Sequence, residues 1–109
     1  MPRLFSYGSL RHANVQLTAF GRLLEGKEDE LVGFELVSIT RAGKQLANVT
    51  RNGLDDSRVA GMVFEVSEAE LLAADEYERG DSYVRISARL ASGIETWVYA
   101  YEESIDEKK

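Results

Sequence analysis

Residues 59–70 read Val59-Ala60-Gly61-Met62-Val63-Phe64-Glu65-Val66-Ser67-Glu68-Ala69-Glu70, a strand pattern that runs directly into the start of a helix. The first part of this run is apolar at nearly every position, which predicts a strand covered on both faces. Ser67 and Glu70 form a capping box, in which each side chain accepts a hydrogen bond from a backbone N–H at the start of the helix. We therefore expect a strand followed by a helix over residues 67–79, which Gly80 ends.

Shorter strand patterns lie on both sides of this unit. The segments with strand-like composition are residues 4–7, 23–24, 31–40, 45–50, 59–66, 83–90 and 95–101. A second, shorter helix is predicted over residues 14–20, with Asn14 as its N-cap and Gly21 at its end. About six or seven strands and two short helices in a chain of this length predict an α+β fold, in which the sheet is curled or closed and the helices pack outside it.

The chain has 109 residues, no cysteine and a net charge of −6. We expect one domain, with residues 1–101 folded and residues 102–109 forming an acidic, flexible tail. The lack of cysteines, of a signal-peptide pattern and of an apolar run near the roughly 20 residues that cross a bilayer predicts a cytoplasmic protein that does not contact membranes. The acidic balance argues against nonspecific binding of nucleic acids, although a local basic pocket for a small anion stays open.

The longer predicted helix carries a candidate general base. Leu71, Ala74 and Glu78 lie at positions i, i+3 and i+7, so the carboxylate extends an otherwise apolar face. Burial would raise the pKa of Glu78 and make it a better base near neutral pH. The alternative is that the helix end frays and Glu78 lies in solvent. Glu76 falls on the opposite face, and Asp75 lies at the margin, where it is expected to cap or brace the local structure.

The loop after the first predicted strand, Tyr7-Gly8-Ser9-Leu10, is a candidate ligand cradle. Gly8 tolerates backbone angles that other residues avoid, and it lets a ligand approach the chain closely. The N–H groups of such a loop can hold a carboxylate or a developing oxyanion. A plain turn is the alternative, because glycine and serine are common turn residues.

Together, this loop and the later segment Asp75-Glu76-Tyr77-Glu78 resemble the γ-glutamylcyclotransferase family. The likeness includes the strand pattern at residues 59–66 and extends to about residue 101. It implies a small mixed β-barrel with short helices around it. By position, the resemblance implies substrate-binding roles for Tyr7, Gly8, Ser9, Leu10, Tyr83 and Arg85, and a catalytic role for Glu78.

The reaction that the resemblance implies is an intramolecular cyclisation. The α-amino group of a γ-glutamyl amine or γ-glutamyl amino acid attacks its own side-chain carbonyl, which gives 5-oxoproline and a free amine, with Glu78 as general acid and base. No metal or other cofactor is implied, and the expected partner is the small γ-glutamyl substrate. With pKa values of about 8 for an α-amine and about 4.3 for Glu, the proton transfer costs roughly 5 kcal/mol, which burial of both groups would reduce.

Two stretches depart from the family pattern. Arg79 follows Glu78, where relatives often have glycine, and residues 45–49 lack the family's Tyr-Pro-Ala type of segment. The first departure bears on the pose of Glu78. The second bears on the pocket wall that faces the amine half of the substrate.

Other interpretations of the same residues stay open. Arg85 can form a structural salt bridge instead of contacting substrate, and His12, the only histidine, can pair with Ser9 as a nucleophile. Arg11 can meet an anionic substrate or lie on the surface. The whole chain can be a non-catalytic small-molecule-binding or accessory module of the same fold, or it can act on another small amide. A homodimer through an exposed sheet face is also open.

Overall fold

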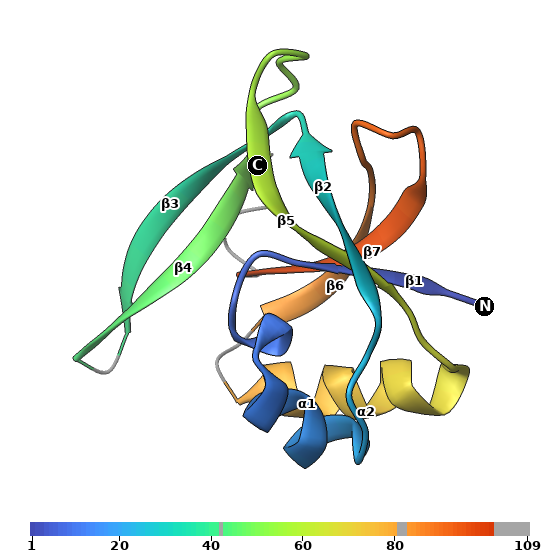
Figure 1. Cartoon of the computed structure of the whole chain (residues 1–109). Coiled ribbons are helices and arrows are strands. Elements are labelled where there is room, and N and C mark those ends of the chain that lie inside the picture. Colours follow the sequence, from blue (N-terminus) through green and yellow to red (C-terminus); the bar gives the residue numbers. More distant parts are fainter. Residues whose placement is uncertain (42, 81–82, 102–109) are drawn as a thin grey trace.

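The main sheet has five strands in the order β2-β5-β1-β7-β6, and β3 and β4 form a separate hairpin (Figure 1). This computed structural model describes residues 1–41, 43–80 and 83–101, so the predicted tail at 102–109 lies outside the described residues. The strands are β1 (Arg3–Ser6), β2 (Gly26–Val32), β3 (Phe34–Arg41), β4 (Lys44–Arg51), β5 (Arg58–Glu65), β6 (Tyr83–Arg89) and β7 (Glu95–Tyr101). The helices are the short 3-10 helix η1 (Ser9–Arg11), α1 (Ala13–Phe20) and α2 (Glu68–Arg79). This α+β arrangement confirms the predicted fold class.

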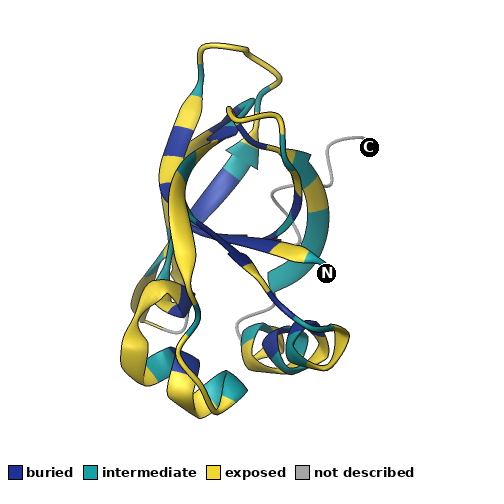
Figure 2. Ribbon diagram, turned by 45° about the vertical axis from the view of Figure 1, so that its right-hand side comes forward, coloured by how far each residue is buried: buried dark blue, intermediate teal, exposed yellow. Residues whose placement is uncertain are grey.

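The five-stranded sheet curls into a barrel-like shape, which Figure 2 shows as a ring of strands beside the helices. β1 lies at its centre, antiparallel to β5 and parallel to β7. Its two edges meet at a bridge between Leu31 and Leu90, next to which the N–H of Ala91 donates to the carbonyl of Glu30 at 2.8 Å. In the part of the chain that the structure describes, the edges share no longer ladder. The mixed barrel is therefore a strongly curled sheet that closes at one point.

Apolar side chains form a cluster on each face of this sheet. The cluster inside the curl contains Phe5, Leu31, Phe34, Val49, Val59, Val63, Leu90, Val98 and Ala100. The cluster between the sheet and the helices contains Leu4, Leu10, Phe64, Val66, Leu71, Ala74 and Tyr99. Neighbouring residues of β1 enter opposite clusters, as the alternation of a strand requires. Burial of both faces of β1 fixes the start of the loop that follows it.

The expectation that residues 59–66 are covered on both faces holds for only half of β5. Val63 and Phe64 are both buried, whereas Arg58 and Ala60 are exposed. The difference follows from the position of the helices, because the only buried residue that β5 contributes to the helix-side cluster is Phe64, near its end, with Met62 packed against that cluster only in part. Toward its start, β5 therefore alternates like a strand with one face open to solvent.

The expected single strand over residues 31–40 is wrong, because Gly33 divides it. Gly33 has a positive φ of 85°, ends β2 and sends β3 into the separate hairpin. Its N–H donates to the carbonyl of Ser57 at 2.9 Å. Its own carbonyl accepts from the N–H groups of Asn52 and Gly53 at 2.8 and 3.0 Å. The break is thus held by the predicted loop before β5, which composition alone does not connect to residue 33.

Both longer helices pack on the outer face of the sheet (Figure 1). α1 has His12 as its N-cap instead of the expected Asn14, and it ends at Gly21 with a φ of 75°, as predicted. The predicted start of α1 is wrong because His12 makes no side-chain cap hydrogen bond and so leaves no capping signal in the sequence. Residues 23–24 lie between α1 and β2, so their assignment to a strand is wrong. Among the described residues, no helix has the length and apolar composition needed to span a membrane.

α2 begins with the predicted capping box. The N–H of Glu70 donates to Ser67 Oγ at 3.1 Å, and the N–H of Ser67 donates to Glu70 Oε1 at 2.9 Å. Arg22 Nη2 also donates to Glu70 Oε1 at 2.9 Å, and the hydrogen bonds from Arg22 lower the pKa of Glu70 to about 2. The helix ends at Arg79 with Gly80 as its C-cap. These contacts fix the first turn of α2 and so orient its last turn.

Candidate active site

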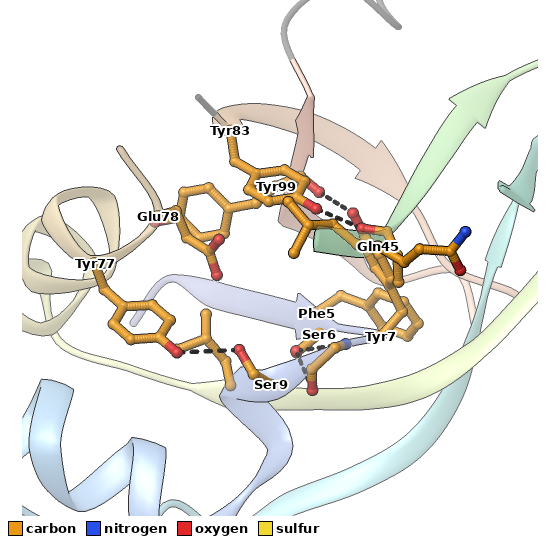
Figure 3. Close-up of a pocket in the computed structure, with 13 residues that line it drawn as sticks. Phe5, Ser6, Tyr7, Ser9, Gln45, Tyr77, Glu78, Tyr83 and Tyr99 are labelled. Atoms are coloured by element: carbon orange, nitrogen blue, oxygen red, sulfur yellow. Dashed lines mark hydrogen bonds between the residues drawn. The ribbon is translucent and has the colours of Figure 1, made fainter. Parts of the chain in front are cut away.

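A cavity brings together segments that lie far apart in the sequence (Figure 3). It has a volume of about 190 Å³ and lies between the loop after β1, the end of α2 and strand β4. Its lining residues are Phe5, Ser6, Tyr7, Gly8, Ser9, Leu10, Gln45, Leu46, Ala47, Tyr77, Glu78, Tyr83 and Tyr99. The structure therefore groups every predicted site residue except Arg85.

The loop after β1 presents backbone donors to this cavity. The N–H of Gly8 donates to Ser6 Oγ at 3.2 Å, and the carbonyl of Gly8 accepts from the N–H of Arg11 at 3.2 Å. Within residues 1–41, 43–80 and 83–101, no protein acceptor contacts the N–H groups of Ser9 and Leu10. Those two N–H groups are available to an anionic ligand.

Gly8 does not adopt a positive φ. Its φ of −133° lies outside the left-handed region that favours glycine. A Cβ atom at this position would meet no atom within 4 Å. Glycine here leaves open space beside the loop, so close approach of a ligand is the part of the expectation that the geometry supports.

Glu78 lies on the face of α2 that the sequence predicts. Leu71 and Ala74 on this face are buried, and Glu78 is half-buried at the cavity. Its carboxylate points toward the space above Ser9 and Ser6 (Figure 3). α2 continues to Arg79, so the alternative in which the helix frays before Glu78 is wrong. The raised pKa expected for Glu78 stays a prediction.

Tyr7 ties the loop to β7. Its Oη donates to the backbone carbonyl of Tyr99 at 2.7 Å. Burial raises the pKa of Tyr7 far above the usual range of tyrosine, and the neighbouring Tyr83 and Glu78 raise it further. Burial also raises the pKa of Tyr99, with added contributions from Asp75 and Glu78. Both phenols therefore stay protonated donors at ordinary pH.

Tyr83 holds the hairpin over the cavity. Its Oη donates to the carbonyl of Ala47 at 2.5 Å, which joins β6 to β4. Asn48 Oδ1 accepts from the N–H of Tyr101 at 2.8 Å and adds a second link between β4 and the main sheet. Gln45, Leu46 and Ala47 thus form a wall of the cavity.

Arg85 is not among the residues that line the cavity, and its predicted contact with substrate stays a prediction. Its Nε donates to Asp75 Oδ1 at 2.9 Å and its Nη2 to Asp75 Oδ2 at 3.1 Å. Its guanidinium lies over the ring of Trp97, 4.6 Å from the centroid. The structure thus contains the salt bridge that the sequence left open for Arg85, and its partner is Asp75. Asp75 braces the local structure, as its position at the margin of the helix face suggested.

The structure does not pair the hydroxyl of Ser9 with the side chain of His12, which was the alternative for a nucleophilic serine. Ser9 Oγ lies 3.2 Å from the hydroxyl of Tyr77, and His12 contacts Ser9 through its backbone N–H at 2.9 Å. Arg11 is exposed, and its Nε donates to the carbonyl of Gly8 at 3.1 Å. Arg11 therefore supports the loop from outside the cavity.

Four lining residues were not identified from the sequence. They are Phe5, Ser6, Tyr77 and Tyr99. Tyr77 precedes Glu78 directly, and that adjacency is a usable signal. Gln45, Leu46 and Ala47 belong to the segment that the resemblance placed at the pocket wall, and they line the cavity.

The charge of the cavity is negative. Among the described lining residues, Glu78 is the only one with an ionisable acid or base other than tyrosine. Elsewhere in the described residues, no three His, Cys, Asp or Glu side chains gather as a metal site would require. The cavity can therefore offer a ligand one carboxylate, several hydroxyls and backbone N–H groups.

Comparisons with known proteins give the same fold. A family model described as gamma-glutamyl cyclotransferase, AIG2-like, matches residues 4–109. A solution structure of an Arabidopsis thaliana protein is similar with a TM-score of 0.76 and 22% identity, over 94% of this chain and 63% of that chain. A structure named gamma-glutamyl cyclotransferase has a TM-score of 0.72 and 20% identity, over 90% of this chain and 64% of that chain.

An uncharacterized protein from Pyrococcus horikoshii is also similar, with a TM-score of 0.66 and 18% identity, over 93% of this chain and 78% of that chain. No curated protein matches the sequence. The chain spans less than two thirds of the length of the Arabidopsis protein and of the named cyclotransferase, at 63% and 64%. At these identities the solved structures show the fold.

Proposed function

The chain belongs to the gamma-glutamyl cyclotransferase, AIG2-like family, and we propose that it cyclises a γ-glutamyl amine or γ-glutamyl amino acid to 5-oxoproline, with Glu78 as general acid and base. One observation carries this proposal. Glu78, Ser9 and Leu10 line the same cavity although they come from opposite parts of the chain, and no acceptor among the described residues contacts the N–H groups of Ser9 and Leu10. A base and an anion cradle at one small site are what the cyclisation needs.

The proposed reaction starts with the substrate held at the loop. The N–H groups of Ser9 and Leu10 receive a negatively charged oxygen of the substrate, its α-carboxylate or the oxyanion that develops on the γ-carbonyl. Glu78 takes a proton from the α-ammonium group, and the freed amine attacks the γ-carbonyl carbon, which forms the ring C–N bond. Glu78 passes this proton to the leaving nitrogen and takes a second proton from the ring nitrogen, so that the amide C–N bond breaks to give a neutral lactam and a neutral amine. The second proton then goes to the released amine, which leaves as its ammonium form. No water enters the products, so the atoms balance.

The half-buried position of Glu78 suits this exchange. The α-amine and a solvated glutamate differ by about 4 pKa units, which is roughly 5 kcal/mol against the first transfer. Partial burial disfavours the charged form of each group and narrows that gap. Since nucleophile and carbonyl belong to one molecule, the remaining task of the cavity is to select the bent substrate conformer.

The charge of the lining supports a preference within the substrate class. A γ-glutamyl amino acid carries a second carboxylate on its leaving half, and no cationic side chain of the described lining is placed to meet it. Near Glu78 that carboxylate would be repelled. We expect neutral or cationic leaving amines to be accepted better than amino acids.

The test is an incubation of the purified protein with γ-glutamyl amines and γ-glutamyl amino acids, with 5-oxoproline detected by mass spectrometry. The Glu78→Gln variant should lose about 10²-fold or more of kcat, the usual contribution of a general base or acid. Glu76→Gln is the matched control, because Glu76 lies two positions away on the exposed face and pairs with Arg79. Equal rates of turnover for wild type and Glu78→Gln would overturn the role of Glu78. A folded protein that binds substrates without turnover would favour the non-catalytic binding module.

A further inference from the structure

Three side chains, Asp75, Arg85 and Tyr99, tie the end of α2 to the sheet. Asp75 lies one turn before Glu78, and its carboxylate accepts two hydrogen bonds from Arg85, at 2.9 and 3.1 Å. The hydroxyl of Tyr99 donates to Asp75 Oδ1 at 2.6 Å. Arg85 belongs to β6 and Tyr99 to β7. One carboxylate therefore anchors the last turns of the helix to two neighbouring strands.

This network is more restricted than a surface ion pair. The side chains of Asp75 and Arg85 are 22% and 25% exposed, and Tyr99 is 5% exposed. The guanidinium makes two parallel hydrogen bonds and stacks on Trp97, which confines it to one orientation. On the exposed side of the same helix, the Glu76–Arg79 pair is 73% and 66% exposed, so it orients little.

Tyr99 joins the two halves of the site. Its hydroxyl contacts Asp75 on α2, and its backbone carbonyl accepts the hydrogen bond from Tyr7 Oη at the start of the loop. Its ring lines the cavity next to Glu78. The helix that carries the carboxylate and the loop that carries the N–H donors are thus both fixed against one residue of β7.

We infer that Asp75, Arg85 and Tyr99 are positioning residues that set the place of Glu78 relative to the loop at residues 7–10. The inference rests on the proposed function, because it takes Glu78 as the base. Asp75 and Arg85 line a neighbouring groove of about 610 Å³ and not the cavity, so they act through α2 and Tyr99. Arg85 also neutralises Asp75, which spares Glu78 an uncompensated negative charge one turn away.

The test uses three variants that each remove one part of the network. Asp75→Asn and Arg85→Lys each disrupt the pair of hydrogen bonds between Arg85 and Asp75. Tyr99→Phe removes only the hydroxyl that donates to Asp75. We expect kcat for 5-oxoproline formation to fall by between about tenfold and about a hundredfold, the cost of a base displaced by about 1 Å. KM should change by less than about threefold, because the loop that receives the substrate keeps its N–H groups. Glu76→Gln is the control and should match wild type.

The same series of variants distinguishes a positioning role of these residues from a role in stability alone. Rates are measured at a temperature at which circular dichroism shows every variant folded. The Asp75→Asn/Arg85→Lys double variant should be no slower than the slower single variant, because both changes break one contact. Unchanged kcat in folded variants with lowered melting temperatures overturns the inference. So does a loss in kcat that multiplies in the double variant.

Hydrogen exchange keeps this test apart from that of the proposed function. In Tyr99→Phe, the amides of residues 76–79 should exchange faster than in wild type, while those at the start of α2 stay protected. The loop at residues 7–10 should keep its exchange, because the substitution retains the backbone carbonyl that accepts from Tyr7. Unchanged exchange at residues 76–79 overturns the positioning role, with or without turnover. Altered exchange together with a wild-type protein that makes no 5-oxoproline overturns the proposed function and leaves the anchoring of α2 through Tyr99 standing.

Discussion

Replacement of Gly8 by alanine tests whether the open space beside the loop is occupied by substrate. A Cβ at Gly8 meets no atom within 4 Å, and its φ of −133° is negative. The methyl group should therefore leave the fold intact, with a change in the free energy of unfolding below about 1 kcal/mol. It should instead enter the cavity.

The size of the cavity sets the expected effect on activity. A methyl group takes up a space similar to that of a water molecule, about 30 Å³, which is roughly a sixth of the cavity of about 190 Å³. A substrate in the proposed pose would be displaced by about 1 Å, and such a displacement costs up to about a hundredfold in rate. We expect kcat/KM to fall by between about tenfold and about a hundredfold.

Gly61→Ala is the matched comparison with the opposite outcome. A Cβ there would lie against the carbonyl oxygen of Ser6 and the ring of Phe5, at 2.4 and 2.6 Å. Because the backbone oxygen cannot move aside easily, overpacking should cost about 1–3 kcal/mol. At about 4 °C or more per kcal/mol, the melting temperature should fall by several degrees.

Both variants are examined by thermal unfolding and by 5-oxoproline formation. The expected result is a stable and slow Gly8→Ala beside a destabilised Gly61→Ala. A Gly8→Ala protein with wild-type kcat/KM would refute the placement of substrate against the loop. A Gly8→Ala protein that unfolds earlier would refute the assignment of open space at its Cβ.

Three further predictions concern protonation and substrate charge. Because burial raises the pKa values of Tyr7 and Tyr99 above the ordinary value of about 10, the stability that they contribute is complete below pH of about 10 and is lost as pH rises beyond it. An absorbance titration of the folded protein should leave Tyr7 and Tyr99 un-ionised above the ordinary pKa of about 10, and ionisation of all five tyrosines there would contradict this. Hydrogen bonds from Arg22 lower the pKa of Glu70 to about 2, so its contribution is present above the ordinary value of about 4.3 and is lost as pH falls toward about 2. Glu70→Gln should flatten the acid limb of a stability–pH curve, and an unaltered limb would count against the ion pair. Finally, γ-glutamyl amines should show higher kcat/KM than γ-glutamyl amino acids, and the reverse order would contradict the charge argument.

Local signals in the sequence were sufficient for much of the fold. The capping box at Ser67 and Glu70 predicted the start of α2, and the periodicity of Leu71, Ala74 and Glu78 predicted its buried face. The boundary at Gly33 was missed, because the break depends on hydrogen bonds to a loop that follows some twenty residues later. Tertiary partners of that kind leave no local pattern.

For the candidate site, the sequence predicted the loop at residues 7–10 and the carboxylate of Glu78, but it did not predict all of the residues around them. Tyr7 and Glu78 carry chemistry that a pattern can reveal, and the structure places both at one cavity. Gln45 reaches that cavity only because β4 folds back over it, and no spacing rule links it to Tyr7. The family resemblance implied that Arg85 contacts the substrate. In the structure, the carboxylate of Asp75, ten residues earlier, holds the guanidinium of Arg85 outside the cavity.

The most direct test of the central claim is a turnover experiment in water enriched with ¹⁸O. A γ-glutamyl amine is incubated with wild type, Glu78→Gln and Glu76→Gln, and the masses of the products are measured by mass spectrometry. Intramolecular cyclisation with Glu78 as base predicts unlabelled 5-oxoproline and one equivalent of amine from wild type and Glu76→Gln, and almost none from Glu78→Gln. Glutamate carrying ¹⁸O, or 5-oxoproline formed equally well by Glu78→Gln, would contradict the account.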